Sequence, residues 1–282
     1  MRIFLPILLT LAIGLTLTSC KSRRSGKNGP NAGFERVETA QEFLQALRPG
    51  ARILLATGDY NLTEMAGMTT SYLSWDDPYD GEEVHLANLS NVIIRGEDGA
   101  RLLAVPRYAW VLRFDQCNNL KFENVTFGHT EEGYCLGGVL AFEGCTGISI
   151  SECNLYGSGT EGLLLNGVVD FKMEDSRIYE CTYDLMTVNG SRNLLFENCS
   201  FTETGQFNLI NLSASEDVLF DECTFSENYN ENFMPYFFYL EGNRGGIAVR
   251  NCTFTENRVQ KFVNRPSELE LDDNDFEGND FD

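Results

Sequence analysis

Seven segments decide the fold: LKFENVTF (120–127), ISISECNL (148–155), FKMEDSRI (171–178), LLFENCSF (194–201), VLFDECTF (218–225), IAVRNCTF (247–254) and LELDDNDF (269–276). Their apolar residues alternate, shift by one position and alternate again, which predicts two short strands joined at a bend. One such unit cannot bury its own apolar face. Because the units recur every 22 to 29 residues, we expect them to stack as the coils of a solenoid.

A further apolar segment lies upstream of six of these units, at VLRF (111–114), VLAF (139–142), GLLL (162–165), LMTV (185–188), LINL (209–212) and FFYL (237–240). Three short strands per coil of about two dozen residues predict an all-β parallel β-helix. A leucine-rich repeat would need an LxxLxLxxN pattern, which is missing, and a propeller blade would need about 40 residues. Both alternatives are therefore excluded.

The start of the repeat carries a helix signal. Thr39 and Glu42 form a capping box ahead of apolar residues, so residues 40–48 are predicted to form a short amphipathic helix that covers the first coil. Residues 52–62 and 84–105 supply less regular early coils. The β-helix domain is expected to span residues 38–282.

These repeats resemble the pectate-lyase-like superfamily of right-handed parallel β-helices over roughly residues 40–276, and LRPGARILLATGDY (47–60) is similar to the start of chondroitinase- and alginate-lyase-type enzymes. The resemblance implies a single-stranded, right-handed β-helix solenoid. The resemblance is specific for the fold and not for the activity, because this superfamily contains lyases, hydrolases, epimerases and adhesins. The Arg-x-Pro-x-x-Arg pattern of pectate lyases and the catalytic elements of polygalacturonases are absent, so no known catalytic set carries over.

Residues 1–20 have the features of an export signal. Arg2 precedes an apolar run over residues 3–17, and Leu-Thr-Ser-Cys (17–20) resembles a bacterial lipobox with Cys20 as the lipidated residue. An ordinary signal peptide is the alternative. Residues 21–37 indicate a flexible tether, and Lys21 in place of aspartate favours the outer membrane. We expect a monomeric lipoprotein of the bacterial cell envelope.

Composition restricts the partners. The chain has 42 acidic and 21 basic residues and a formal net charge of −21, which argues against nucleic acid and counts against a polyuronate substrate. Cys153, Cys199, Cys223 and Cys252 occupy one column of the alignment, which indicates stacked, buried thiols, although a disulfide between neighbouring coils is conceivable.

The outward columns of the upstream strand contain the candidate site. Glu161 and Asp184 are expected to stack on adjacent coils as catalytic carboxylates, because paired carboxylates and aromatic platforms suit a sugar. His129 is a third catalytic candidate, in an insertion expected to form a loop beside the groove. The candidate substrate-binding residues are Trp110, Arg113, Tyr134, Tyr183, Asn208, Tyr236 and Tyr239. A hydrated acidic surface is the alternative interpretation of the column.

No cofactor is expected. Asp115 and Glu143 are candidate calcium ligands in an outward oxygen ladder, although such stacks are commonly structural. The favoured function is recognition of a polysaccharide or oligosaccharide in the groove. A glycoside hydrolase or polysaccharide lyase is the first alternative, and a structural surface protein without a small ligand is the second.

Overall fold

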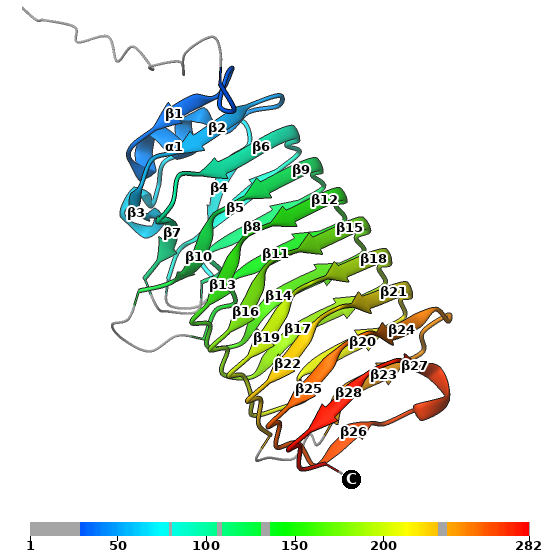
Figure 1. The fold of residues 1–282 in the computed structure, drawn as a ribbon. Coiled ribbons are helices and arrows are strands. Elements are labelled where there is room, and N and C mark those ends of the chain that lie inside the picture. The colour runs from blue at the N-terminus through cyan, green and yellow to red at the C-terminus, as the bar shows by residue number, and fades with distance from the viewer. Residues whose placement is uncertain (1–28, 79–80, 106–108, 131–135, 231–235, 282) are drawn as a thin grey trace, which may run out of the picture.

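A computed structural model describes residues 29–78, 81–105, 109–130, 136–230 and 236–281. The chain winds into a β-helix whose coils stack along one axis, with α1 (Ala40–Ala46) at one end and the last coil at the other (Figure 1). Each regular coil contributes one strand to each of three sheets, which confirms the predicted three-strand coil. The sheets are called A, B and C below.

Sheet A holds the first strand of each repeat unit. In chain order it contains β1 (Glu35–Val37), β2 (Arg52–Leu55), β6 (Ser90–Gly96), β9 (Asn118–Glu123), β12 (Thr146–Ser151), β15 (Val169–Glu174), β18 (Arg192–Glu197), β21 (Glu216–Asp221), β24 (Ile247–Arg250) and β27 (Glu270–Asp272). Its parallel register places Leu120 beside Ile148 and Ile148 beside Phe171, so the alignment of the repeats is confirmed.

Sheet B holds the second strand of each unit. It contains β3 (Gly58–Asn61), β7 (Ala100–Ala104), β10 (Thr126–His129), β13 (Asn154–Tyr156), β16 (Arg177–Tyr179), β19 (Ser200–Thr202), β22 (Thr224–Ser226), β25 (Thr253–Thr255) and β28 (Asp275–Glu277). The inward phenylalanines of this sheet stack coil upon coil: Phe225 and Phe254 lie 4.7 Å apart between ring centroids.

Sheet C holds the upstream strands. It contains β4 (Leu73–Asp76), β5 (Glu83–Ala87), β8 (Leu112–Asp115), β11 (Leu140–Glu143), β14 (Glu161–Asn166), β17 (Asp184–Asn189), β20 (Ile210–Ser213), β23 (Tyr236–Glu241) and β26 (Lys261–Val263). All its pairs are parallel except β4 with β5, which form an antiparallel pair. The early coils are therefore irregular, as expected. The short 3₁₀ helices η1 (Leu62–Met65) and η2 (Pro266–Glu268) interrupt the first and last coils.

The N-terminal helix has the predicted cap. Thr39 Oγ1 accepts a hydrogen bond from the Glu42 backbone N–H at 3.1 Å, and Glu42 Oε2 accepts one from the Glu38 N–H at 2.8 Å. The reciprocal bond thus reaches one residue further back than in the usual capping box. Phe43 and Leu44 are fully buried against the first coil, which confirms the covering role of α1.

Each corner between two sheets contains a buried ladder of side-chain acceptors. A backbone N–H at one corner donates to the side chain at the same corner of the next coil, as from Cys153 N to Ser176 Oγ at 3.0 Å and from Asn228 N to Asn257 Oδ1 at 3.2 Å. These bonds satisfy backbone groups where the sheet ladder is interrupted. The cysteines of the described chain are buried and unpaired, and they occupy the same positions: Cys117, Cys145, Cys153, Cys181, Cys199, Cys223 and Cys252.

Candidate functional site

The outer face of sheet C brings the two predicted carboxylates together. Glu161 begins β14, Asp184 begins β17, and the two are direct partners in the parallel register. Neighbouring strands lie about 4.8 Å apart, so the carboxyl groups are neighbours on the surface. The predicted stacking of these residues on adjacent coils is confirmed.

The local surroundings disfavour charge on both carboxyls. The Glu161 Oε2 and Asp184 Oδ1 atoms are inaccessible to solvent and have no hydrogen-bond partner. Burial raises the pKa of Glu161 to about 7, against a side-chain hydrogen bond with Thr187 that lowers it. Burial and then the negative charge of Glu161 raise the pKa of Asp184 to about 8. The pair therefore retains a proton near neutral pH.

An asparagine pair holds Asp184 in place. Asn211 Nδ2 donates to Asp184 Oδ2 at 3.0 Å, and Asn208 Nδ2 donates to Asn211 Oδ1 at 3.2 Å. Asn208 is buried and also accepts a hydrogen bond from the Tyr236 backbone N–H at 3.2 Å. Asn208 thus lies beneath the outer face of sheet C. It bonds to Asn211, which in turn bonds to the Asp184 carboxylate. The sequence interpretation omitted Asn211 and Thr187 from the site, although their place in the adjacent outward column could have revealed them.

The Trp110 ring packs over Gly138, a position without a side chain. A Cβ atom at Gly138 would lie 2.2 Å from the Trp110 ring, so glycine leaves the space that the indole occupies. Gly138 precedes Val139, whose N–H donates to the Glu161 carbonyl at 3.1 Å. The half-buried indole therefore lies one coil from the carboxylate pair. The Trp110 backbone N–H donates to the buried Glu83 at 3.1 Å, which anchors this segment.

Three predicted tyrosines lie beyond the pair. Tyr236 and Tyr239 are half-buried, with ring centroids 6.0 Å apart. Tyr183 directly precedes Asp184 and packs edge-to-face on Phe207 at 4.8 Å. Aromatic rings therefore flank the carboxylates on both sides along the helix axis. Tyr134, the remaining predicted aromatic, lies outside the described residues.

Arg113 is held within a network of acidic side chains. Its guanidinium lies 2.7 Å from Glu143 Oε1, 3.1 Å from Glu83 Oε1 and 3.7 Å from Asp76 Oδ2. Asp76 also pairs with His85, at 3.3 Å between Oδ2 and Nδ1. The predicted substrate-binding arginine is therefore on the correct face, but acidic side chains already surround it.

His129 does not join this face. It ends β10 in sheet B, it is 2% exposed, and its Nε2 lies 3.0 Å from the Ala109 carbonyl oxygen. Burial lowers its pKa. The expectation of a loop position beside the groove is wrong, because residues 126–129 continue the regular strand of their coil. The catalytic role of His129 has no geometric support.

The candidate calcium ligands are direct partners in the register, with Asp115 on β8 and Glu143 on β11. Glu143 forms an ion pair with Arg113. Among the residues that the structure describes, no group of three or more histidine, cysteine, aspartate or glutamate side chains is placed to hold a metal ion. The further members of the ladder bond to one another, as Asn189 does to Asn166 at 3.2 Å.

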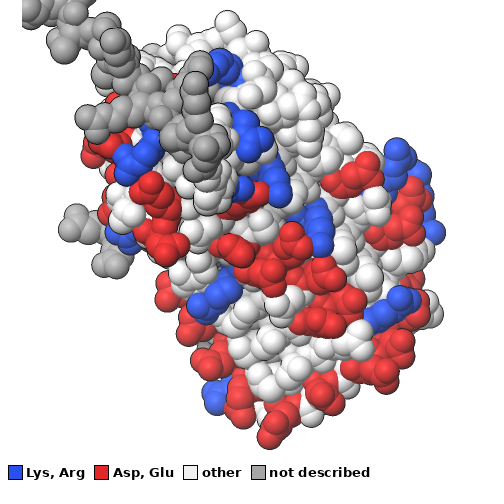
Figure 2. All heavy atoms as spheres, turned by 45° about the horizontal axis from the view of Figure 1, so that its top comes forward, with Lys and Arg blue, Asp and Glu red and all other residues white. Residues whose placement is uncertain are grey.

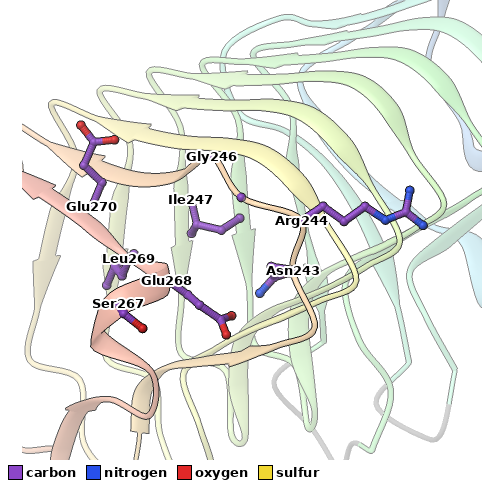
Figure 3. Close-up of a pocket in the computed structure, with 9 residues that line it drawn as sticks. Asn243, Arg244, Gly246, Ile247, Ser267, Glu268, Leu269 and Glu270 are labelled. Carbon is purple, nitrogen blue, oxygen red and sulfur yellow. The ribbon is translucent and has the colours of Figure 1, made fainter.

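A separate pocket of about 470 Å³ lies at the last coils, between the turn after β23 and η2 (Figure 3). Glu268 and Asn243 line it, and the Arg244 guanidinium points away from the other labelled residues. It contains none of the residues predicted for the site. We place the candidate site on sheet C, because the two predicted carboxylates lie there.

Cys20 and the rest of the expected leader lie outside the described residues. Within the described part of the chain, no helix has the length and apolar character needed to cross a membrane.

Comparisons with solved structures agree with the fold. A pectin methylesterase from Aspergillus niger is 11% identical with a TM-score of 0.57, over 92% of this chain and 89% of that one. A pectate lyase is 12% identical with a TM-score of 0.50, over 89% and 78% of the two chains. A pectin methylesterase mutant solved in complex with a hexasaccharide is 11% identical with a TM-score of 0.51, over 91% and 88%.

At these identities the likeness shows the fold alone. No curated protein sequence matches the chain. Residues 110–281 match the family described as the right handed beta helix region. Since this match covers more than half of the 282 residues and the structure shows the corresponding coils, the chain belongs to the right-handed β-helix family.

Proposed function

We propose that the protein recognises a polysaccharide or oligosaccharide on the outer face of sheet C. The observation that carries the proposal is the in-register pair of Glu161 and Asp184 between Trp110 and the Tyr236–Tyr239 pair. Sugar rings stack on aromatic side chains, and their hydroxyl groups donate to carboxylate oxygens. The resemblance of the fold to carbohydrate-active enzymes supports the same class of ligand.

Binding to a broad glycan array tests this proposal. At least one oligosaccharide should bind, and Trp110→Ala or Asp184→Asn should weaken that binding by about tenfold or more. Tyr179→Ala is the matched control, because Tyr179 stacks on Tyr156 on sheet B, away from this face. Absence of any bound glycan, or equal loss of affinity in the control, would contradict the proposal.

A second candidate function is hydrolysis of the bound glycan. It is favoured by the raised pKa values of the pair, because a carboxyl that stays protonated near neutral pH can act as a general acid beside an ionised base. Purified protein would then release new reducing ends. Glu161→Gln should abolish this release while glycan binding persists, and unchanged turnover in that variant would exclude the role of Glu161.

We further propose that the chain is exported and anchored by lipid at Cys20 to the bacterial outer membrane. The lipobox-like Leu-Thr-Ser-Cys and the basic, glycine-containing residues that follow support this location. Radiolabelled fatty acid should be incorporated into the full chain and not into Cys20→Ser. Equal incorporation by both proteins would exclude Cys20 as the attachment site.

A further inference from the structure

The charge distribution around the carboxylate pair bears on which class of glycan the face can hold, if the proposed function is correct. Next to Glu161 and Asp184, the outward middle column carries Leu164, Thr187 and Asn211, which are uncharged. The pair itself is therefore flanked by uncharged groups, of which Thr187 and Asn211 can form hydrogen bonds without neutralising an anion.

The nearest guanidinium in the middle column belongs to Arg113, and acidic side chains already balance its positive charge. In the register of sheet C, Arg113 lies two coils before Leu164. Its guanidinium forms ion pairs with Glu83 and Glu143. Glu83 is 2% exposed, so its charge is largely hidden from water and depends on Arg113 for compensation. A sugar carboxylate could pair with Arg113 only by displacing a carboxylate that needs it.

Lys261 is the cation at the other end of the carboxylate column. It is the register partner of Tyr236, and its Nζ lies 5.8 Å from the Tyr236 ring centroid. Three strand steps of about 4.8 Å place it roughly 14 Å along the column from Asp184. That separation exceeds the Debye length of about 8 Å at physiological ionic strength, so Lys261 does little to offset the negative charge that a uronate would bring to the pair.

The side chains beside the pair that a ligand can reach are uncharged and able to form hydrogen bonds. The Thr187 hydroxyl and the Asn211 amide are half-buried in the middle column beside the pair, whereas Glu161 Oε2 and Asp184 Oδ1 are closed to solvent. Sugar hydroxyl groups are donors, whereas a uronate carboxylate is only an acceptor. In a chain of formal net charge −21, acidic side chains, which gather in patches on the face seen in Figure 2, add a general repulsion of polyanions.

We infer that the Glu161–Asp184 face takes an uncharged glycan through its hydroxyl groups and rejects uronate polymers. This assignment differs from the pectin- and pectate-directed activities named for the structural neighbours. The difference has a local cause, because Arg113, the arginine of this face, already forms ion pairs with Glu83 and Glu143.

Matched oligosaccharides that differ only at C6 test the inference. Calorimetric titrations would compare mannohexaose with hexamannuronate, and galactohexaose with hexagalacturonate, with a chitosan hexamer as a cationic probe. The neutral member of at least one pair should bind about tenfold or more tightly than its uronate counterpart. Tighter binding of a uronate or of the chitosan hexamer would overturn the inference while leaving the proposed function intact. Failure of every probe and of the array would defeat both.

Releasing Arg113 provides an independent test. Glu143→Gln removes one carboxylate partner of the guanidinium, so the uronate should gain affinity and the preference for the neutral glycan should narrow by several-fold. Glu241→Gln is the control, because Glu241 lies at the far end of the same outward column. A purely structural role of Glu143 would weaken both ligands equally, and that outcome would contradict the compensation of Arg113 as the cause.

Discussion

At the residue scale, the pair of Glu161 and Asp184 combines two effects that are usually separate. One oxygen of each carboxyl is closed to water, and each carboxyl lies beside another. Both effects oppose ionisation. The pair is therefore costly to the fold when it is fully charged, which is the expected signature of a site kept for binding or chemistry rather than for stability.

This cost predicts how stability depends on pH. In the unfolded chain both carboxyls ionise near their ordinary pKa values of 4.5 and 3.8, whereas in the folded protein they ionise near 7 and 8. Between these limits the folded state binds more protons, so the free energy of unfolding falls as the pH rises from about 4 to about 8. Asp184→Asn should remove up to about 5 kcal/mol of this decline, because the pKa of Asp184 is about 8 rather than 3.8 and each pKa unit corresponds to about 1.4 kcal/mol.

Denaturant unfolding at pH 5.0 and 8.5 measures the effect. Asp272→Asn serves as the control, because Asp272 is exposed on β27 and its substitution removes the same charge. This control also corrects for general repulsion in a chain of net charge −21. Equal pH dependence in the two variants would show that the pair is ionised in the folded protein at lower pH.

At the element scale, the corner ladders connect the sheets. Asn257 is fully buried, and its Oδ1 accepts from Asn228 N at 3.2 Å and from Asn228 Nδ2 at 3.0 Å. Its Nδ2 donates to the Phe225 carbonyl at 2.9 Å and to Asn279 Oδ1 at 2.8 Å. One side chain thus satisfies polar groups of the coils before and after its own.

Asn257→Ala should lower the free energy of unfolding by about 3 kcal/mol or more, because several buried donors and acceptors lose their partners at once. Asn189→Ala is the matched control. Asn189 takes part in an exposed ladder on sheet C and should cost less than about 1 kcal/mol. Thermal and urea unfolding of both variants provide the comparison, and similar losses would show that the corner bonds contribute little.

The two ends of the solenoid are covered differently. The α1 helix closes the first coil with buried Phe43 and Leu44. At the last coil Leu271 is 45% exposed and Phe276 is 47% exposed, beside acidic residues of β27 and β28. Charge rather than a second helix borders that edge, which agrees with the use of charged side chains to discourage strand addition.

At the scale of the whole molecule, the interior is continuous from coil to coil, and the cysteines within the described ranges are buried free thiols. Burial raises the pKa of Cys153 and of Cys181 to about 12, so their thiolate forms are scarce. All seven described cysteines are buried, so a thiol reagent should not reach them in the folded protein.

Thiol titration checks this expectation. A Cys135→Ser variant lacking residues 1–20 contains only the seven described cysteines. It should react with a thiol reagent only after unfolding, and its melting temperature should be the same with and without reductant. A fall of several degrees on reduction would reveal a disulfide between neighbouring coils.

The β-helix, the coil register and the face of each column could all be predicted from the repeat. These properties follow from the alternation of apolar residues and from the constant spacing of units, which are local and periodic. The stacking of Glu161 on Asp184 follows from that register alone. The same logic misplaced His129, because the sequence pattern of residues 126–129 did not show where their strand ended.

Only the tertiary structure decided the partners of Arg113, the support of Asp184 by Asn211 and Asn208, and the position of the Trp110 indole over Gly138. Column alignment predicts which Cα atoms are neighbours, but a long side chain can reach the adjacent column or the next coil. Glu83 comes from an irregular early coil that the repeat does not predict. The repeat thus specifies the fold. The charge of the site depends on side chains, such as those of Arg113 and Glu83, whose contacts the repeat does not predict.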